Sequence, residues 1–79
     1  MTLNVKIENS VKGSAISVEI EETDSVGDVI AFASQYWDNE TIAYVMKFGN
    51  RLLSANISIG ELGLKNGDTL VLVPDPQGG

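Results

Sequence analysis

The apolar residues of this chain change their spacing along the sequence, from every second residue to a helical period and back again. Residues 2–8 and 15–21 alternate polar and apolar side chains, as strands with one buried face do. The apolar members of the two segments are Leu3, Val5, Ile7, Ile16, Val18 and Ile20. The run 9–14 between them is polar and contains residues that tolerate turns. We therefore predict an N-terminal β-hairpin with a six-residue loop.

A helical period follows in residues 25–37. Counted from Val26, apolar residues recur three, four, seven, ten and eleven positions later, at Val29, Ile30, Ala33, Tyr36 and Trp37. Ser25 is a favourable N-cap, and Asp28 three residues later completes the sequence of a capping box. The polar run 38–41 interrupts the stripe. These features predict one amphipathic helix that ends near Trp37 and buries its apolar stripe.

The second half of the chain returns to strand-like alternation. Residues 44–48 alternate, Gly49-Asn50 favours a turn into 51–53, and the turn sequence 66–68 precedes the β-prone run 69–73. A helix with one apolar stripe needs one apolar surface to pack against. The expected fold class is α+β, with a mixed sheet of four to five strands packed on one α-helix. We expect the first and last strands to be parallel neighbours at its centre.

The amino-acid composition excludes several kinds of functional site. The 79 residues include no Cys and no His, and 5 Lys+Arg stand against 11 Asp+Glu, for a formal net charge of -6. Disulfides, thiolate zinc sites, cysteine nucleophiles and histidine bases are thereby excluded. The acidic balance disfavours nucleic acid, and no apolar stretch approaches the roughly 20 residues of a membrane span. We expect a cytoplasmic monomer that is not an enzyme and binds neither metal nor cofactor.

Over its whole length the sequence resembles ubiquitin-like proteins, with three extra residues in the first hairpin loop. The positions that carry the resemblance are Leu3, Val5, Ile16, Val18, Ile20, Asp24 to Val26, Val29, Phe48, Leu53, Ile59, Leu64, Leu70, Leu72, Gly78 and Gly79. The resemblance implies a β-grasp fold. We expect a ubiquitin-like domain over residues 1–73 and a flexible, extended tail over 74–79.

The tail is chemically informative. Pro74 and Pro76 cannot donate to a strand ladder and favour extended backbone, so the residues after them should project. Gly78 and Gly79 have no Cβ, which lets a narrow tunnel admit them. The resemblance implies that a separate enzyme adenylates the Gly79 carboxylate and that a thioester then passes it to a substrate lysine. The implied partners are activating and conjugating enzymes, a deconjugating protease, and proteins modified on lysine.

Departures from ubiquitin indicate different partners. Asp75 stands where the family member ubiquitin has a basic residue, and we expect Asp75 and Gln77 to be read by a dedicated activating enzyme. Of the lysines through which ubiquitin builds chains, only Lys6 is retained, which argues against chain building.

A possible partner patch lies on the sheet face opposite the helix. Alternation points Val45, Lys47, Val71 and Val73 away from the core, and apolar side chains gathered on a surface mark interaction sites. Lys47 replaces the central isoleucine of ubiquitin's recognition surface. The alternative is that Val71 and Val73 serve only β-propensity.

Two other functions stay open. A sulfur carrier of the thiamin or molybdopterin type would share the Gly67-Asp68 turn, the proline-containing tail and the two glycines, with a thiocarboxylate at Gly79. A non-covalent scaffold or secretion component would use only the valine patch. The stretch 51–64 is more similar to ubiquitin, which favours conjugation.

Overall fold

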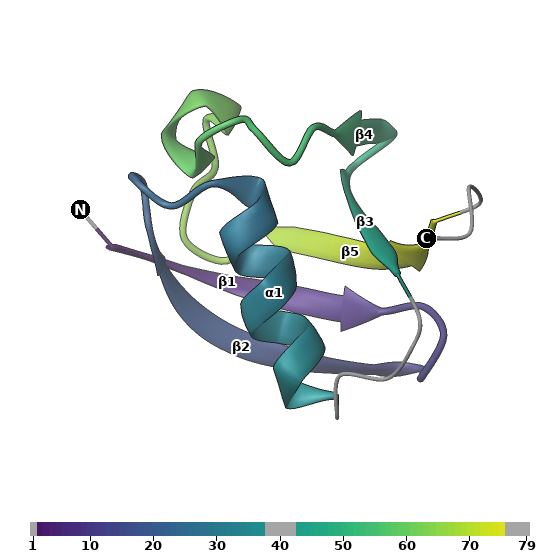
Figure 1. Cartoon of the computed structure of the whole chain (residues 1–79). Coiled ribbons are helices and arrows are strands. Elements are labelled where there is room, and N and C mark those ends of the chain that lie inside the picture. Colours follow the sequence, from purple (N-terminus) through teal and green to yellow (C-terminus); the bar gives the residue numbers. More distant parts are fainter. Residues whose placement is uncertain (1, 38–42, 76–79) are drawn as a thin grey trace.

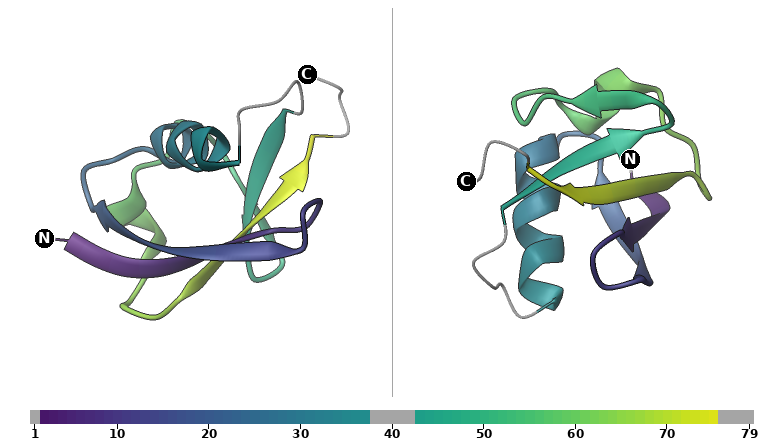
Figure 2. Two further views of the ribbon diagram at one scale, coloured as in Figure 1. Left: turned by 90° about the horizontal axis from the view of Figure 1, so that it is seen from below. Right: turned by 90° about the vertical axis from the view of Figure 1, so that its right-hand side faces the viewer.

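The strands form where apolar residues alternate, and the helix forms where they follow a helical period. The computed structural model describes residues 2–37 and 43–75. Its elements are β1 (Thr2–Asn9), β2 (Ser14–Glu21), α1 (Val26–Tyr36), β3 (Tyr44–Phe48), β4 (Arg51–Leu53), the short 3-10 helix η1 (Ile59–Leu62) and β5 (Thr69–Pro74). The strands form one five-stranded sheet in the order β2-β1-β5-β3-β4, with α1 packed across one face (Figures 1 and 2).

The pairing of the strands confirms the predicted fold class. β1 and β5 run parallel side by side, and the other neighbours are antiparallel. A parallel pair needs a long crossover, and the chain between β1 and β5 supplies it with the helix and the second strand pair. The sheet is therefore mixed, and its central strand β5 is covered by a strand on each side.

The core lies between the sheet and α1. Its buried members from the described residues are Leu3, Val5, Ile7, Ile20, Val26, Val29, Ala33, Met46, Leu53, Ile59, Leu62, Leu64, Leu70 and Leu72. The strand members come from alternate positions, and the helix members are three or four residues apart. Apolar periodicity thus located the buried face of each element.

The first hairpin loop is shorter than the six residues expected. Asn9 pairs with Ser14 as the last rung of the β1–β2 ladder, which leaves only residues 10–13 in the loop. Asn9 continues the inward face after Ile7 and is 1% exposed. The prediction failed because a polar residue was assigned to the loop, whereas a buried asparagine is tolerated where its amide is fully hydrogen-bonded.

The Asn9 side chain joins the hairpin loop to β3. Its Oδ1 accepts the Val11 N–H at 2.9 Å and the Lys12 N–H at 3.0 Å, and its Nδ2 donates to the Tyr44 hydroxyl at 3.1 Å. We expect Asn9→Ala to lower the free energy of unfolding by about 2 kcal/mol. The Tyr44 hydroxyl would lose a part-buried hydrogen-bond partner, and the Val11 and Lys12 amides of the loop would lose their acceptor. Tyr44→Phe removes only the cross-strand bond and should cost about half as much. Urea unfolding followed by Trp37 fluorescence measures both, and equal losses would contradict this account.

Helix α1 begins and ends where the sequence predicts, but one residue of its predicted apolar stripe is exposed. The Ser25 Oγ accepts the Asp28 N–H at 3.0 Å, and the Asp28 Oδ2 accepts the Ser25 N–H at 3.3 Å, which confirms the capping box. Tyr36 is 62% exposed and does not belong to the buried stripe. At about 100° per residue, Tyr36 lies within about 20° of the buried Val29, so the helical period does not distinguish the two residues. Tyr36 is the last residue of α1, and its exposure arises at this end of the helix.

Trp37 ends the helix and attaches it to the sheet. As the C-cap it is half-buried, and its indole Nε1–H donates to the Ser14 Oγ of β2 at 2.8 Å. The same hydroxyl belongs to the residue that closes the first hairpin. One contact therefore fixes the end of α1 against the start of β2.

The last strand runs one residue beyond the boundary expected at Val73. Pro74 is the final residue of β5 and lies opposite Tyr44, and the Asp75 N–H donates to the Ala43 carbonyl at 2.9 Å. A proline is accepted there because the missing donor falls at the end of the ladder. Residues 76–79 lie outside the described residues, so the division into domain and tail stays a prediction.

Candidate functional site

The outer face of the sheet, which α1 leaves uncovered, carries the four residues predicted as a partner patch. In the β3–β5 ladder Val45 lies opposite Val73, and Lys47 lies opposite Val71. Directly paired residues of adjacent strands point to the same face. All four are half-buried. The structure therefore brings them together, and their role in binding a partner stays a prediction.

A fifth residue, which the sequence reading did not single out, extends this surface. Leu52 of β4 pairs with Lys47 and is 62% exposed. The short Gly49-Asn50 connection could have revealed it, because a tight hairpin fixes which residues face each other. Strand register therefore creates a row across the sheet that reads Leu52, Lys47, Val71, Glu8 and Ala15.

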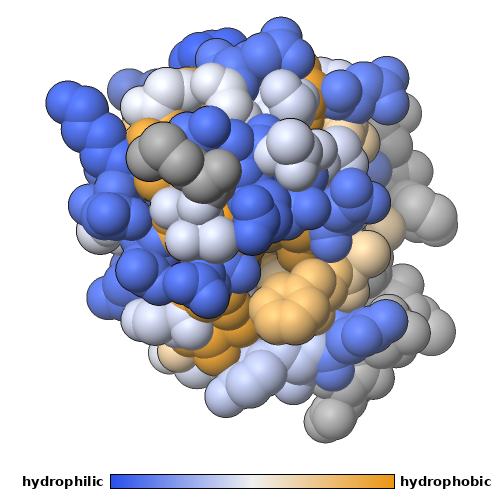
Figure 3. Space-filling model, turned by 90° about the vertical axis from the view of Figure 1, so that its left-hand side faces the viewer, coloured by the Kyte–Doolittle hydropathy of each residue, from blue (hydrophilic) through white to orange (hydrophobic). Residues whose placement is uncertain are grey.

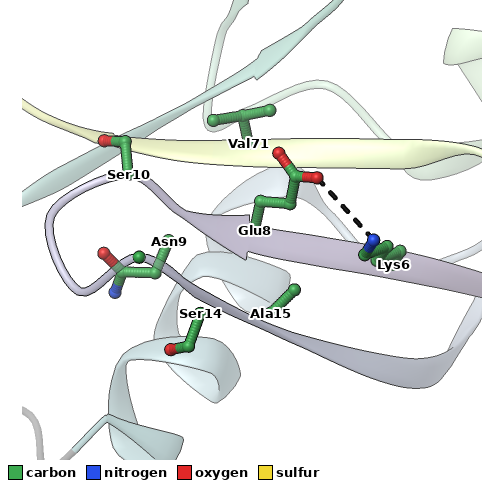
Figure 4. A pocket seen from close by; sticks show the side chains of 8 residues that line it. Lys6, Glu8, Asn9, Ser10, Ser14, Ala15 and Val71 are labelled. Carbon is green, nitrogen blue, oxygen red and sulfur yellow. Dashed lines mark ion pairs between the residues drawn. The ribbon is translucent and has the colours of Figure 1, made fainter.

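A shallow hollow of about 390 Å³ continues the row past Val71, beside the first hairpin loop. Figure 4 shows Glu8 and Lys6 on β1 with Val71 on the neighbouring strand. The Lys6 Nζ lies 3.8 Å from the Glu8 Oε2, and both side chains are about half exposed, so solvent screens this pair. The hollow offers a mixture of charge, hydroxyl and aliphatic surface to a partner.

Lys47 is the cation that stands among the aliphatic side chains of β3, β4 and β5 on the outer face. It stands between Val71 and Leu52, and within residues 2–37 and 43–75 it forms no ion pair. No group of acidic residues in this described part is arranged to hold a metal ion. The arrangement suits recognition of another surface, since it gathers aliphatic area around one cation.

Of the residues predicted to take part in activation and conjugation, the structure describes only Asp75. Asp75 is half-buried beside the start of β3, where its amide donates to the Ala43 carbonyl. Gln77, Gly78 and Gly79 lie outside the described residues. Their predicted roles in activation and conjugation therefore rest on the sequence, together with the position at which β5 ends.

Comparison with known proteins identifies the fold of this chain. No protein-family profile and no curated protein sequence matches the chain. Among solved structures, the ubiquitin of Caldiarchaeum subterraneum is similar with a TM-score of 0.82 and 23% identity, over 100% of both chains. The UBL domain of Plasmodium falciparum Dsk2 is similar with a TM-score of 0.82 and 25% identity, over 95% of this chain and 100% of that one. The chain has the ubiquitin-like β-grasp fold.

A third similar structure is a chain of the pParkin-pUb-UbcH7 complex, with a TM-score of 0.83 and 19% identity. The match covers 94% of this chain and 23% of that one, so the fold also occurs as one part of a longer protein. In the ubiquitin-like fold of the present chain, no helix within the described residues is long and apolar enough to cross a membrane. At identities of 19 to 25% these similarities show the architecture of the chain, and a fold does not dictate a function.

Proposed function

We propose that this ubiquitin-like chain is a protein modifier whose Gly79 carboxylate is joined to lysines of other proteins. The observation that carries the proposal is the position of Gly78-Gly79 relative to the fold. The ladder holds the backbone as far as the Asp75 amide, and Gly78 and Gly79 are the third and fourth residues after it in sequence. Four extended residues span at most roughly 14 Å, which is long enough to reach into an enzyme's cleft from the edge of the sheet.

The chemistry requires a free carboxyl group on Gly79, either as a natural terminus or after cleavage behind it. A carboxylate oxygen attacks the α-phosphate of ATP and displaces pyrophosphate, giving an acyl adenylate. A cysteine thiolate of the activating enzyme then attacks the carbonyl carbon and AMP leaves, which forms a thioester. Finally a lysine Nε attacks the thioester, the thiol departs, and an isopeptide bond remains. This chain has no Cys and no His, so the other proteins supply every reactive group except the acid.

Recognition by these enzymes is proposed to use two separate surfaces. Asp75, which is fixed by its bond to Ala43, and Gln77 would be read by the dedicated activating enzyme, since an acidic group excludes enzymes that require a basic one. The outer face with Val45, Lys47, Val71 and Val73, extended by Leu52, would dock conjugating enzymes or receptors.

Mass spectrometry of material from the native host tests the proposal. Lys65 is the last basic residue, so trypsin leaves a remnant running from Asn66 to Gly79 on each modified lysine, and a search for a bare Gly-Gly remnant would miss it. We expect this long remnant on lysines of other proteins. A sulfur carrier would instead show the intact chain with one oxygen replaced by sulfur. A non-covalent scaffold would show neither product, and either result would overturn the modifier.

A further inference from the structure

A second hollow lies at the opposite edge of the sheet from β4, where β2 runs beside α1. Its volume is about 250 Å³, which is sufficient for a single long side chain but not for a folded segment. The residues that line it are Glu19, Ile20, Asp24, Asp28, Val29 and Phe32. Three of these are aliphatic or aromatic and three are acidic. The hollow is separate from the outer face and from the end of β5.

The apolar part of this hollow includes an aromatic ring that the fold leaves in solvent. Phe32 is 53% exposed, whereas Ile20 and Val29 beside it are 5% and 2% exposed and belong to the core. Phe32 therefore contributes little to the core, although it stands next to it. Figure 3 shows this side of the molecule with hydrophobic surface bordered by hydrophilic residues. Apolar surface framed in this way is typical of an interaction site.

The acidic part is held in place by the backbone. The Asp24 Oδ2 accepts the Glu21 N–H at 3.0 Å, and the Asp28 Oδ2 accepts the Ser25 N–H at 3.3 Å, so both carboxylates have fixed positions. None of the six described residues that line the hollow is a lysine or an arginine. Within the described part of the chain, these carboxylates also do not form a group that could hold a metal ion.

We propose that this hollow binds an arginine side chain of a partner protein. The aliphatic stem of arginine would cover the exposed edges of Ile20 and Val29, and its planar guanidinium would stack on the Phe32 ring. The same guanidinium would donate hydrogen bonds to the carboxylates of Asp24 and Asp28 at the rim. Arginine satisfies both halves of the hollow at once, whereas a purely apolar side chain would leave these carboxylates partly desolvated without a counter-charge.

Titration of the full-length, isotope-labelled chain with a blocked Ala-Arg-Ala peptide tests this assignment by NMR. The matched probe is the same peptide with citrulline, which keeps the shape of arginine and removes its charge. We expect amide shifts confined to residues 19–32 and an affinity about fivefold higher for the arginine peptide. Equal affinity for both peptides would overturn the proposal. So would shifts spread over distant acidic residues such as Glu8 and Asp68, because these would indicate general charge attraction.

Two variants on one helix make the test specific. Phe32→Ala should weaken binding of the arginine peptide about fivefold, while Tyr36→Ala removes an equally exposed aromatic outside the hollow and should leave the affinity unchanged. Neither side chain belongs to the core, and thermal unfolding checks that both variants fold. An unchanged affinity in Phe32→Ala would refute the site. The outcome is independent of conjugation, because a chain lacking Gly78 and Gly79 should bind the peptide as well as the complete chain does.

Discussion

Leu70→Ala should remove a large part of the free energy of unfolding, about 2 to 5 kcal/mol. Leu70 is 0% exposed and lies in the central strand β5, where it pairs with Ile7 of β1. Replacing a buried leucine by alanine typically costs about 2 to 5 kcal/mol, because transfer free energy is lost and a cavity remains. A chain of this size has only about 4 to 12 kcal/mol of stability in total. The chain has no disulfide to limit the loss.

The next residue on the same strand provides the control. Val71 points to the outer face and is half-buried, so Val71→Ala should cost less than about 1 kcal/mol. Urea unfolding of both variants, followed by Trp37 fluorescence and circular dichroism, gives the two free energies. Similar losses in the two variants would show that β5 does not separate a core face from a solvent face as described.

Deleting Gly78 and Gly79 should abolish every conjugate while leaving the fold intact. The described core extends from Leu3 to Leu72, and the last described backbone bond is that of Asp75, so the deletion removes no residue of the described core. Immunoblots of an N-terminally tagged chain in the native host, together with the thermal unfolding temperature, measure the two effects. Conjugates that persist after the deletion would contradict the modifier and place the reactive group elsewhere.

A variant of the same length tests whether conjugation requires the two glycines or only a terminal carboxylate. The double substitution of Gly78 and Gly79 by alanine keeps a terminal carboxylate but adds two β-carbons. We expect conjugation to fall strongly in this variant, since a narrow enzyme tunnel accepts bare backbone and excludes side chains. If the alanine variant is conjugated as well as the parent chain, only the free acid is required.

Local sequence patterns predicted most of the elements correctly. Period-two alternation identified the strands, and Ser25 with Asp28 gave the start of α1. The errors concern two residues whose burial differs from what their chemical type or spacing predicts. Asn9 was assigned to a loop because it is polar, although its amide finds three partners inside the fold. Tyr36 was assigned to the helix stripe because its spacing fits the helical period, although it is exposed as the last residue of α1.

The sequence by itself determined which residues of each element turn inward, because that choice depends on the period of a single segment. Tertiary structure decided which outward residues become neighbours. The row from Leu52 through Lys47 to Val71 exists only because three strands pair in one register, and no single strand encodes that register. The hollow beneath Phe32 likewise forms only once β2 lies beside α1. Contacts between distant segments depend on how the elements pack together, and periodicity within one segment carries no information about them.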